Sequence, residues 1–143
     1  MKIRHVGIVV RNLDKALFFW RDLLKFNIEV MMDESGPEID AILGLKNVHV
    51  TTVKMSAPEG GMIELLHFHS HSHSDIEAWN GKPYSTGITH IALTVHNLDL
   101  LYKKLLDAGY NFTNKPQISP DGKVKVIYCQ GHENLLLELV EKL

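Results

Sequence analysis

Apolar and polar positions predict the same order of strands and helices in each half of the chain. Residues 3–10 are apolar and rich in β-branched side chains, which predicts a strand. Asn12 is a suitable N-cap, and apolar residues recur at helical spacing from Leu13 to Leu24, which predicts a helix of about three turns. Residues 33–37 hold acidic side chains, Gly and Pro and are expected to end a strand, and residues 39–45 fit either a short helix or irregular structure. The other strands of this half are expected at residues 26–32, 48–55 and 61–68.

The second half repeats this order with shorter connections. Residues 87–95 predict a strand, and Asn97 is again a suitable N-cap. A helix follows from Leu98 to Ala108, with Gly109 as its C-terminal stop. The remaining segments are expected to be a short extended stretch at 110–112, a loop at 116–122, and strands at 124–129 and 135–140.

Two short motifs are each written twice. His-Val-Gly-Ile-Val-Val at residues 5–10 matches His-Ile-Ala-Leu-Thr-Val at 90–95, and each is followed, after one intervening residue, by Asn-Leu-Asp. Ile-Glu-Leu-Leu at 63–66 matches Leu-Glu-Leu-Val at 137–140. Such self-similarity predicts a repeated architecture. We therefore expect an α+β fold of two tandem βαβββ modules within one compact domain. The expected bounds are residues 1–67 for the first module, 68–86 for a polar linker and 87–143 for the second module.

Each module begins with a histidine and ends with a glutamate on an apolar strand: His5 with Glu64, and His90 with Glu138. Imidazole nitrogen and carboxylate oxygen suit Zn, Ni, Co, Mn or Fe. A histidine on a strand is more often a packed or surface residue, and the pattern around Glu64 does not settle which face of the sheet it takes. Because both residue types recur in both modules, we favour a single mononuclear metal site formed by all four.

Composition excludes several classes of function. The chain has 143 residues, 45% of them hydrophobic, and a net charge of −2, so no basic face is available for nucleic acid or a membrane surface. No apolar run approaches the roughly 18 residues of a membrane span, and the N-terminus has no signal-peptide pattern. The single cysteine, Cys129, excludes an internal disulfide and fits a reducing compartment, so a cytoplasmic protein is expected.

Histidine is unusually frequent, with nine residues, and four of them form an alternating tract. His67, His69, His71 and His73 would share one face if the tract were extended. Such a tract can bind metal. We favour a solvated linker, because polar Ser-containing segments rarely pack.

Taken together, the repeated motifs resemble those of the vicinal oxygen chelate superfamily, the group of glyoxalases, epimerases and extradiol dioxygenases. The resemblance covers nearly the whole chain. It implies that the two modules form a cupped, partly closed mixed sheet with the helices outside, and it implies a homodimer. It also implies one divalent metal ion, such as Zn, Ni, Co or Mn, with His5, Glu64, His90 and Glu138 as its ligands.

Within this superfamily, the resemblance is to the glyoxalase I or methylmalonyl-CoA epimerase type. Glu64 occupies a position that the dioxygenases leave open for substrate and oxygen, which disfavours an extradiol dioxygenase. A ligand-sequestering module similar to bleomycin-resistance proteins is the alternative without catalysis. The Arg and Asn residues that hold glutathione in glyoxalase I are replaced by Val9, Phe68 and Thr86, which disfavours glutathione.

The resemblance implies a lyase or isomerase that moves a proton next to a carbonyl group. The metal would stabilise the enediolate or enolate of a small-molecule substrate, either a 2-oxo compound or an acyl-CoA. Glu138 is the first candidate for the base and Glu64 the second, although both could serve only as ligands. Lys54, Met55 and Tyr128 are candidates for lining the substrate site.

Overall fold

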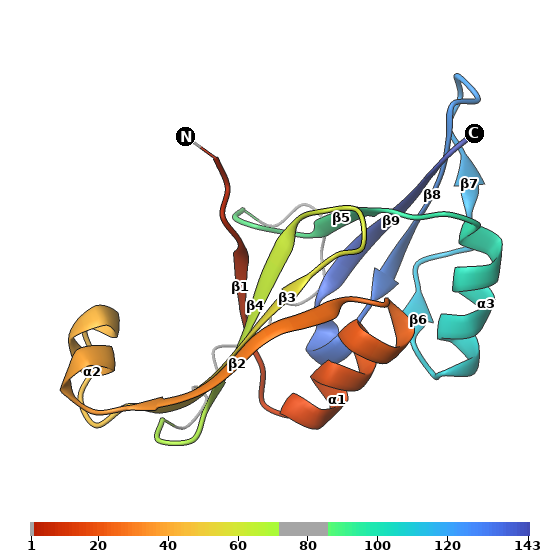
Figure 1. Cartoon of the computed structure of the whole chain (residues 1–143). Coiled ribbons are helices and arrows are strands. Elements are labelled where there is room, and N and C mark those ends of the chain that lie inside the picture. The colour runs from red at the N-terminus through yellow and green to blue at the C-terminus, as the bar shows by residue number, and fades with distance from the viewer. Residues whose placement is uncertain (1, 72–85) are drawn as a thin grey trace. The chain divides into compact units, whose positions relative to one another are not determined.

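The computed structural model describes residues 2–71 and 86–143, and the chain forms two compact units, Met1–Asp75 and Ile76–Leu143 (Figure 1). Each unit has an open sheet of mixed strand orientation and one main helix that follows its first strand. This confirms the predicted α+β class and the βαβββ order of each module. The module bounds of 1–67, 68–86 and 87–143 stay predictions, and most of the expected linker, including His73, lies outside the described residues.

The sheet of the first unit has the order β1-β4-β3-β2. β1 runs parallel to β4, and the β4–β3 and β3–β2 pairs are antiparallel. The elements of this unit are β1 (Val6–Val9), α1 (Leu13–Leu17), the π-helix η1 (Phe18–Leu23), β2 (Asn27–Ser35), α2 (Pro37–Leu43), β3 (His49–Ser56) and β4 (Met62–Phe68).

The first helix begins where the sequence predicts it. The Asn12 side chain accepts a hydrogen bond from the backbone N–H of Lys15 at 2.9 Å and so caps α1. The segment then continues as a π-helix instead of remaining α-helical throughout. Phe19 and Trp20 are fully buried and meet edge to face, whereas Phe18 is exposed. The aromatic side chains of this helix therefore anchor it to the core of the first unit.

One segment of the first unit differs from the expectation, and another takes one of the two alternatives left open. β2 extends to Ser35 instead of ending near residue 32, because Asp33 and Glu34 pair with β3 within the ladder. Residues 37–43 form a helix, α2, with a proline in its first turn and Gly44 in the left-handed region (φ 66°) at its C-terminus. The Asp40 carboxylate accepts the backbone N–H groups of Asn47 and Val48, both at 2.8 Å, and so fixes the return to β3.

The second unit repeats the topology of the first, with the order β5-β9-β8-β6. β5 is parallel to β9, and β8 is antiparallel to β9. The counterpart of β2 is divided into β6 and β7, which both pair with β8, so the loop expected at residues 116–122 contains a short strand. The elements are β5 (Ile91–Thr94), α3 (Leu98–Asp107), β6 (Asn111–Phe112), β7 (Gln117–Ile118), β8 (Val124–Gln130), the 3₁₀-helix η2 (His132–Asn134) and β9 (Leu136–Lys142).

Alternation along β4 decides which face carries the glutamate. Ile63 and Leu65 are buried and lie on the core face of the first sheet, so Glu64 points to the opposite face. β9 repeats this pattern, with Leu137 and Leu139 fully buried on either side of Glu138. We call the side of each sheet that carries Glu64 or Glu138 its glutamate face. Within the described residues, no helix combines the length and apolar character that crossing a membrane requires.

Candidate metal centre

In the first unit, His5 and Glu64 form a close pair. The parallel register of β1 and β4 places Glu64 beside Gly7, and His5 lies two residues before that glycine on the same face. Nε2 of His5 is 3.1 Å from Oε2 of Glu64. Because Gly7 has no side chain, nothing on β1 separates the two groups.

The second unit builds the same pair from His90 and Glu138. The parallel register of β5 and β9 places Glu138 beside Ala92, a small residue two positions after His90. Nε2 of His90 is 3.2 Å from Oε2 of Glu138. The sequence repeat is therefore also a repeat of side-chain geometry, and each predicted histidine meets the predicted glutamate of its own unit. That both pairs hold the same ion stays a prediction.

The spacing within each pair suits two ligands of one ion. Bonds from zinc to histidine nitrogen or carboxylate oxygen are about 2.0–2.2 Å, so neighbouring ligand atoms around a tetrahedral or octahedral ion are about 2.9–3.5 Å apart. The separations of 3.1 and 3.2 Å fall in this range. All four side chains are partly exposed, so an ion can reach them from solvent.

The second nitrogen of each imidazole has a different environment. Nδ1 of His90 lies 2.9 Å from the hydroxyl oxygen of Thr89. When Nε2 binds a metal, Nδ1 carries the proton and donates it to such an oxygen, which fixes the orientation of the ring. Nδ1 of His5 is buried and has no hydrogen-bond partner among the described residues. Sequence reasoning missed Thr89; the available signal was a hydroxyl residue directly before His90, where Arg4 precedes His5.

Each glutamate has a different neighbour on the adjacent antiparallel strand. Nζ of Lys54 is 3.6 Å from Oε1 of Glu64. The equivalent position beside Glu138 is Tyr128, whose ring meets that of His90 edge to face with 5.3 Å between centroids. Burial raises the pKa of the Tyr128 phenol, and the negative charge of Glu138 raises it further, so this hydroxyl stays protonated near neutral pH.

The candidates for lining the substrate site divide between the two faces. Lys54 and Tyr128 lie on the glutamate faces of their sheets, and that they line a substrate site stays a prediction. Met55 does not lie on the glutamate face, because it follows Lys54 on β3 and so points to the core face, where it is fully buried. The expectation for Met55 is therefore wrong.

Part of the first glutamate face is covered by apolar side chains. Leu66 and Phe68 alternate with Glu64 along β4 and share its face. They pack against a buried cluster of Ile39, Val48 and Val50, through which α2 covers the end of this face. Phe68 is thus part of an apolar wall next to the His5–Glu64 pair, at one of the positions where an anchor for glutathione would be expected.

The histidine tract departs in part from the solvated linker that we favoured. His67 belongs to β4, is half-buried, and has its Nδ1 3.1 Å from the Val10 carbonyl oxygen. The His69 backbone N–H donates to the His49 carbonyl at 2.8 Å, so the ladder with β3 continues beyond β4. The ring of His71 contacts Phe68 edge to face. The prediction is therefore wrong for His67, which is a strand residue, whereas His69 is exposed and both His69 and His71 follow the end of β4.

Two βαβββ units, each with a His–Glu pair at its first and last strands, define a glyoxalase-type architecture. The sequence model of the Glyoxalase/Bleomycin resistance protein/Dioxygenase superfamily matches residues 2–139. The chain therefore belongs to this superfamily, which confirms the resemblance to vicinal oxygen chelate proteins.

Solved structures support the same fold. A glyoxalase family protein from Bacillus cereus is 24% identical over 100% of this chain and 95% of its own, with a TM-score of 0.91. A glyoxalase I mutant from Zea mays is 16% identical over 97% of this chain and 47% of its own, with a TM-score of 0.69. The fosfomycin resistance protein FosX from Listeria monocytogenes, complexed with Mn(II) and sulfate, is 14% identical over 99% and 93%, with a TM-score of 0.63. A search of curated proteins gives no match.

Proposed function

We propose that the protein is a divalent-metal-dependent enzyme that moves a proton on the carbon next to a carbonyl group. His5, Glu64, His90 and Glu138 are the proposed ligands of one ion, and Zn, Ni, Co and Mn are the candidate metals. The observation that carries this proposal is the pair of His–Glu contacts, at 3.1 and 3.2 Å, built at the same register in both units. Superfamily membership supports it, because the FosX structure in this superfamily contains Mn(II).

A divalent ion in this centre would polarise a carbonyl oxygen and stabilise the negative charge that develops on it. Removal of the neighbouring proton is assigned to Glu138, because the two carboxylates differ in their partners. Glu64 contacts His5 through one oxygen and Lys54 through the other, whereas Glu138 contacts His90 and has Tyr128 at the position that corresponds to Lys54. A carboxylate with one partner is freer to turn and accept a proton. The protonated Tyr128 hydroxyl is available to donate a hydrogen bond to substrate oxygen.

The surroundings of Glu64 suggest the substrate class. Lys54 supplies a positive charge, and Leu66 and Phe68 supply an apolar wall on the same face. A 2-oxo acid or an acyl-CoA combines a carbonyl group with an anionic group and an apolar part, so we propose these as substrates. We further propose a cytoplasmic homodimer, as the superfamily resemblance implies.

The test is metal analysis combined with proton exchange on untagged full-length protein. The wild type, Glu64→Gln, Glu138→Gln and the surface control Glu38→Gln are stripped with chelator and reloaded with Zn, Ni, Co or Mn. We expect both pair variants to lose one equivalent of metal that the control keeps. In deuterated water, the wild type should exchange the proton next to the carbonyl of a 2-oxo acid or an acyl-CoA, and Glu138→Gln should lose this exchange.

Three results would count against the proposal. If the metal content of both pair variants equals that of the wild type, the His–Glu pairs do not form a metal centre. If the metal is lost as expected but Glu138→Gln exchanges the proton as fast as the wild type, the exchange requires neither the metal nor Glu138. If the reloaded wild type takes up no metal and binds small apolar molecules without exchanging their protons, the protein is instead a sequestering module.

A further inference from the structure

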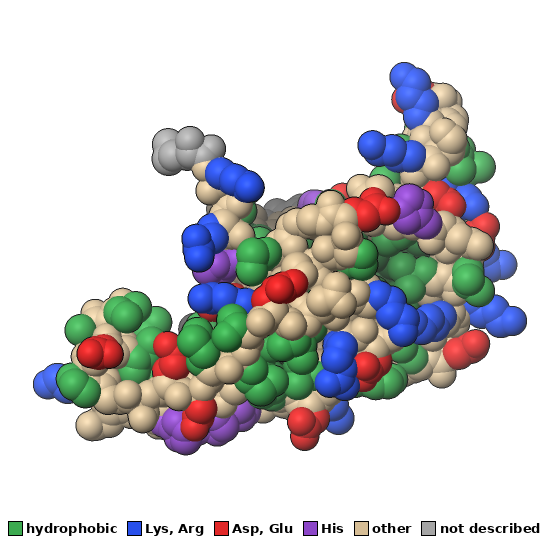
Figure 2. All heavy atoms as spheres, viewed as in Figure 1, with side chains coloured by type: hydrophobic (Ala, Val, Ile, Leu, Met, Phe, Trp, Pro, Cys, Tyr) green, Lys and Arg blue, Asp and Glu red, His purple; other side chains and the backbone are tan. Residues whose placement is uncertain are grey.

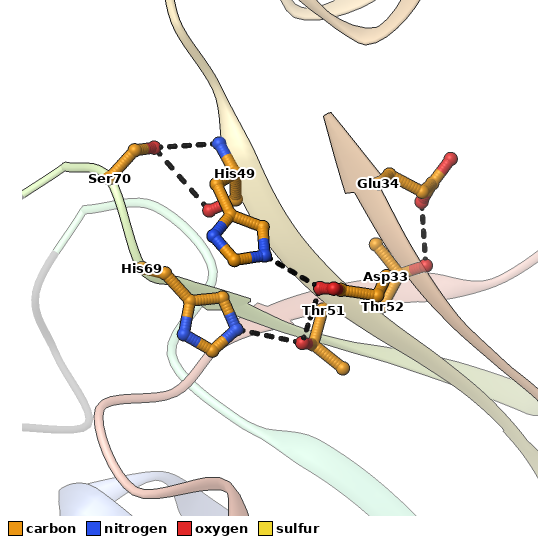
Figure 3. A network of polar contacts seen from close by, with 7 residues as sticks. All are labelled: Asp33, Glu34, His49, Thr51, Thr52, His69 and Ser70. Atoms are coloured by element: carbon orange, nitrogen blue, oxygen red, sulfur yellow. Dashed lines mark hydrogen bonds and ion pairs between the residues drawn. The ribbon is translucent and has the colours of Figure 1, made fainter. Parts of the chain in front are cut away.

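A second group of metal donors lies elsewhere on the first unit. It consists of Asp33 on β2, His49 on β3 and His69 directly after β4 (Figure 3). One donor atom from each residue lies within 4.8 Å of the others, and all three residues are exposed. Figure 2 shows a patch of histidine side chains at the surface near the end of the sheet that leads to α2. We refer to Asp33, His49 and His69 as the outer triad.

Hydrogen bonds link the outer triad through one carboxylate oxygen of Asp33 and the hydroxyl of Thr51. Nε2 of His49 is 2.9 Å from Oδ1 of Asp33. The hydroxyl of Thr51 lies 3.3 Å from the same oxygen and 2.8 Å from Nε2 of His69. The two imidazole rings are stacked, with 4.4 Å between their centroids. Two ring nitrogens and a carboxylate oxygen are thus gathered around one point, and small side-chain rotations would bring all three to one ion.

The backbone holds this arrangement in place. The N–H groups of His69 and Ser70 both donate to the His49 carbonyl, at 2.8 and 3.4 Å. The Ser70 hydroxyl accepts the His49 N–H at 2.8 Å. The ring of His67 meets that of His69 edge to face at 4.6 Å, and His67 is itself fixed by the Val10 carbonyl. Strand pairing therefore places the two histidine donors before any ion binds, which lowers the entropic cost of binding.

The outer triad is separate from the His5–Glu64 pair. Asp33 pairs with Thr51 across the β2–β3 ladder, so both side chains lie on one face. Thr51 and Lys54 are three positions apart on β3 and point to opposite faces. Lys54 shares its face with Glu64, so the outer triad lies on the reverse side of the sheet from the glutamate face.

We propose that Asp33, His49 and His69 bind one divalent transition-metal ion, of which Zn²⁺ and Ni²⁺ are the best fits. Two imidazoles and one carboxylate are a set of borderline donors that such ions prefer over Mg²⁺ or Ca²⁺. The ion takes the place of the hydrogen bond between His49 and Asp33, and water completes its coordination. Because the three ligands come from β2, β3 and the end of β4, the ion also ties these strands together. This proposal does not depend on the proposed function.

The test isolates the outer triad by removing the other centre. The Glu64→Gln/Glu138→Gln double variant, without an affinity tag and stripped with chelator, is titrated with ZnCl₂ and with NiCl₂ by calorimetry near neutral pH. We expect it to bind one ion. Adding His49→Gln or Asp33→Asn should weaken that binding by more than about 100-fold. Loss of a group that only hydrogen-bonds to a ligand weakens binding by about 10- to 100-fold, so a larger effect indicates loss of a ligand itself. Adding His71→Gln, which removes a neighbouring histidine outside the triad, should leave it unchanged.

Thermal unfolding provides a second readout that also checks folding. Zn²⁺ should raise the Tm of the double variant, since an ion that binds only the native state stabilises it. With Asp33→Asn added, the Tm without metal should stay the same and the rise with Zn²⁺ should disappear. The proposal is overturned if the double variant binds no ion, or if His49→Gln and Asp33→Asn leave its affinity intact. Failure of the His–Glu centre has a different signature: the wild type and the double variant would then bind equal numbers of ions.

Discussion

Lys54 and Tyr128 occupy equivalent positions in the two units, each directly across an antiparallel ladder from the glutamate that contacts a histidine. Lys54 places a positive charge 3.6 Å from Glu64, whereas Tyr128 places a neutral phenol beside Glu138. The units share their topology and their His–Glu contacts, so the main chemical difference at these pairs lies in this neighbour. Glu64 is held in place by the charge of Lys54, whereas Glu138, beside the neutral Tyr128, is freer to move.

Replacing Lys54 by methionine should tighten metal binding at the proposed centre. The ammonium group competes with the ion for Glu64 and repels it, and removing one partly solvated charge at this distance changes the energy by about 1 kcal/mol. We therefore expect the dissociation constant for Zn²⁺ to fall by about fivefold to tenfold in calorimetry. Lys123→Met, which removes a lysine paired with Asp121 on an exposed turn, is the matched control. An unchanged or weaker affinity in Lys54→Met would contradict the argument.

Removal of the Thr89 hydroxyl should weaken metal binding by His90. Thr89→Val keeps the shape of the side chain but removes the oxygen 2.9 Å from Nδ1 of His90. Loss of such a partner typically weakens metal binding by about 10- to 100-fold. Thr89→Ser keeps the hydroxyl and should retain most of the affinity. Equal affinities for the valine and serine variants would show that this hydrogen bond does not orient His90.

The pKa of Tyr128 offers a test of the environment of Glu138. Burial is the larger cause that raises this pKa above 10.0, and the charge of Glu138 is the smaller one. Glu138→Gln should therefore lower the pKa of Tyr128 only in part and leave it above the usual value. NMR titration of labelled tyrosine, assigned with Tyr128→Phe, measures this directly. Tyr110, whose pKa is raised by burial and by Cys129, should keep its pKa in the same variant. A full return of Tyr128 to 10.0 would show that charge, and not burial, dominates.

The sequence repeat was enough to predict the βαβββ order of each unit and to select the four residues that form the two His–Glu pairs, although it assigned them to one site and not to a contact within each unit. In each unit the first and last strands pair in parallel. This pairing brings the histidine that precedes the first strand next to the glutamate within the last strand. The caps were also predictable, because Asn12 and Asn97 accept backbone N–H groups of their own helices. Local signals such as these do not depend on the rest of the fold.

Features that depend on tertiary contacts were missed. Asp33 resembled a strand breaker, but pairing with β3 extends β2 through it. Met55 was grouped with Lys54 although adjacent strand residues face opposite sides. The outer triad joins residues far apart in sequence, and His69 belongs to it only because its backbone continues the ladder with β3. In each case the position of the residue depends on strand register, which composition does not reveal.

Cys129 should be inert in the native protein. Its side chain is fully buried, and burial raises the pKa of its thiol to about 12. A thiol reagent that reacts with thiolate near pH 8 should therefore label Cys129 only after unfolding.

A free cysteine has a pKa of about 8.5, so the folded state holds the proton of the Cys129 thiol more tightly than the unfolded state. The corresponding contribution to the free energy of unfolding is complete below about pH 8.5 and is lost as pH rises through 12. Cys129→Ala should flatten this alkaline decline, and rapid labelling of the native thiol would contradict the argument.

The buried residues beside each glutamate should dominate stability. Leu65 and Leu139 are both fully buried, one position after Glu64 and Glu138. Truncating a buried leucine to alanine removes apolar contacts and leaves a cavity, which costs about 2–5 kcal/mol. We expect each variant to lower the free energy of unfolding by this amount in chemical denaturation. Ile42→Ala, at a side chain that is 77% exposed on α2, is the control and should change it by less than about 0.5 kcal/mol. A small effect at Leu65 or Leu139 would mean that the core face of that sheet relaxes to fill the cavity, and the neighbouring glutamate would then be less firmly held than its contact with histidine indicates.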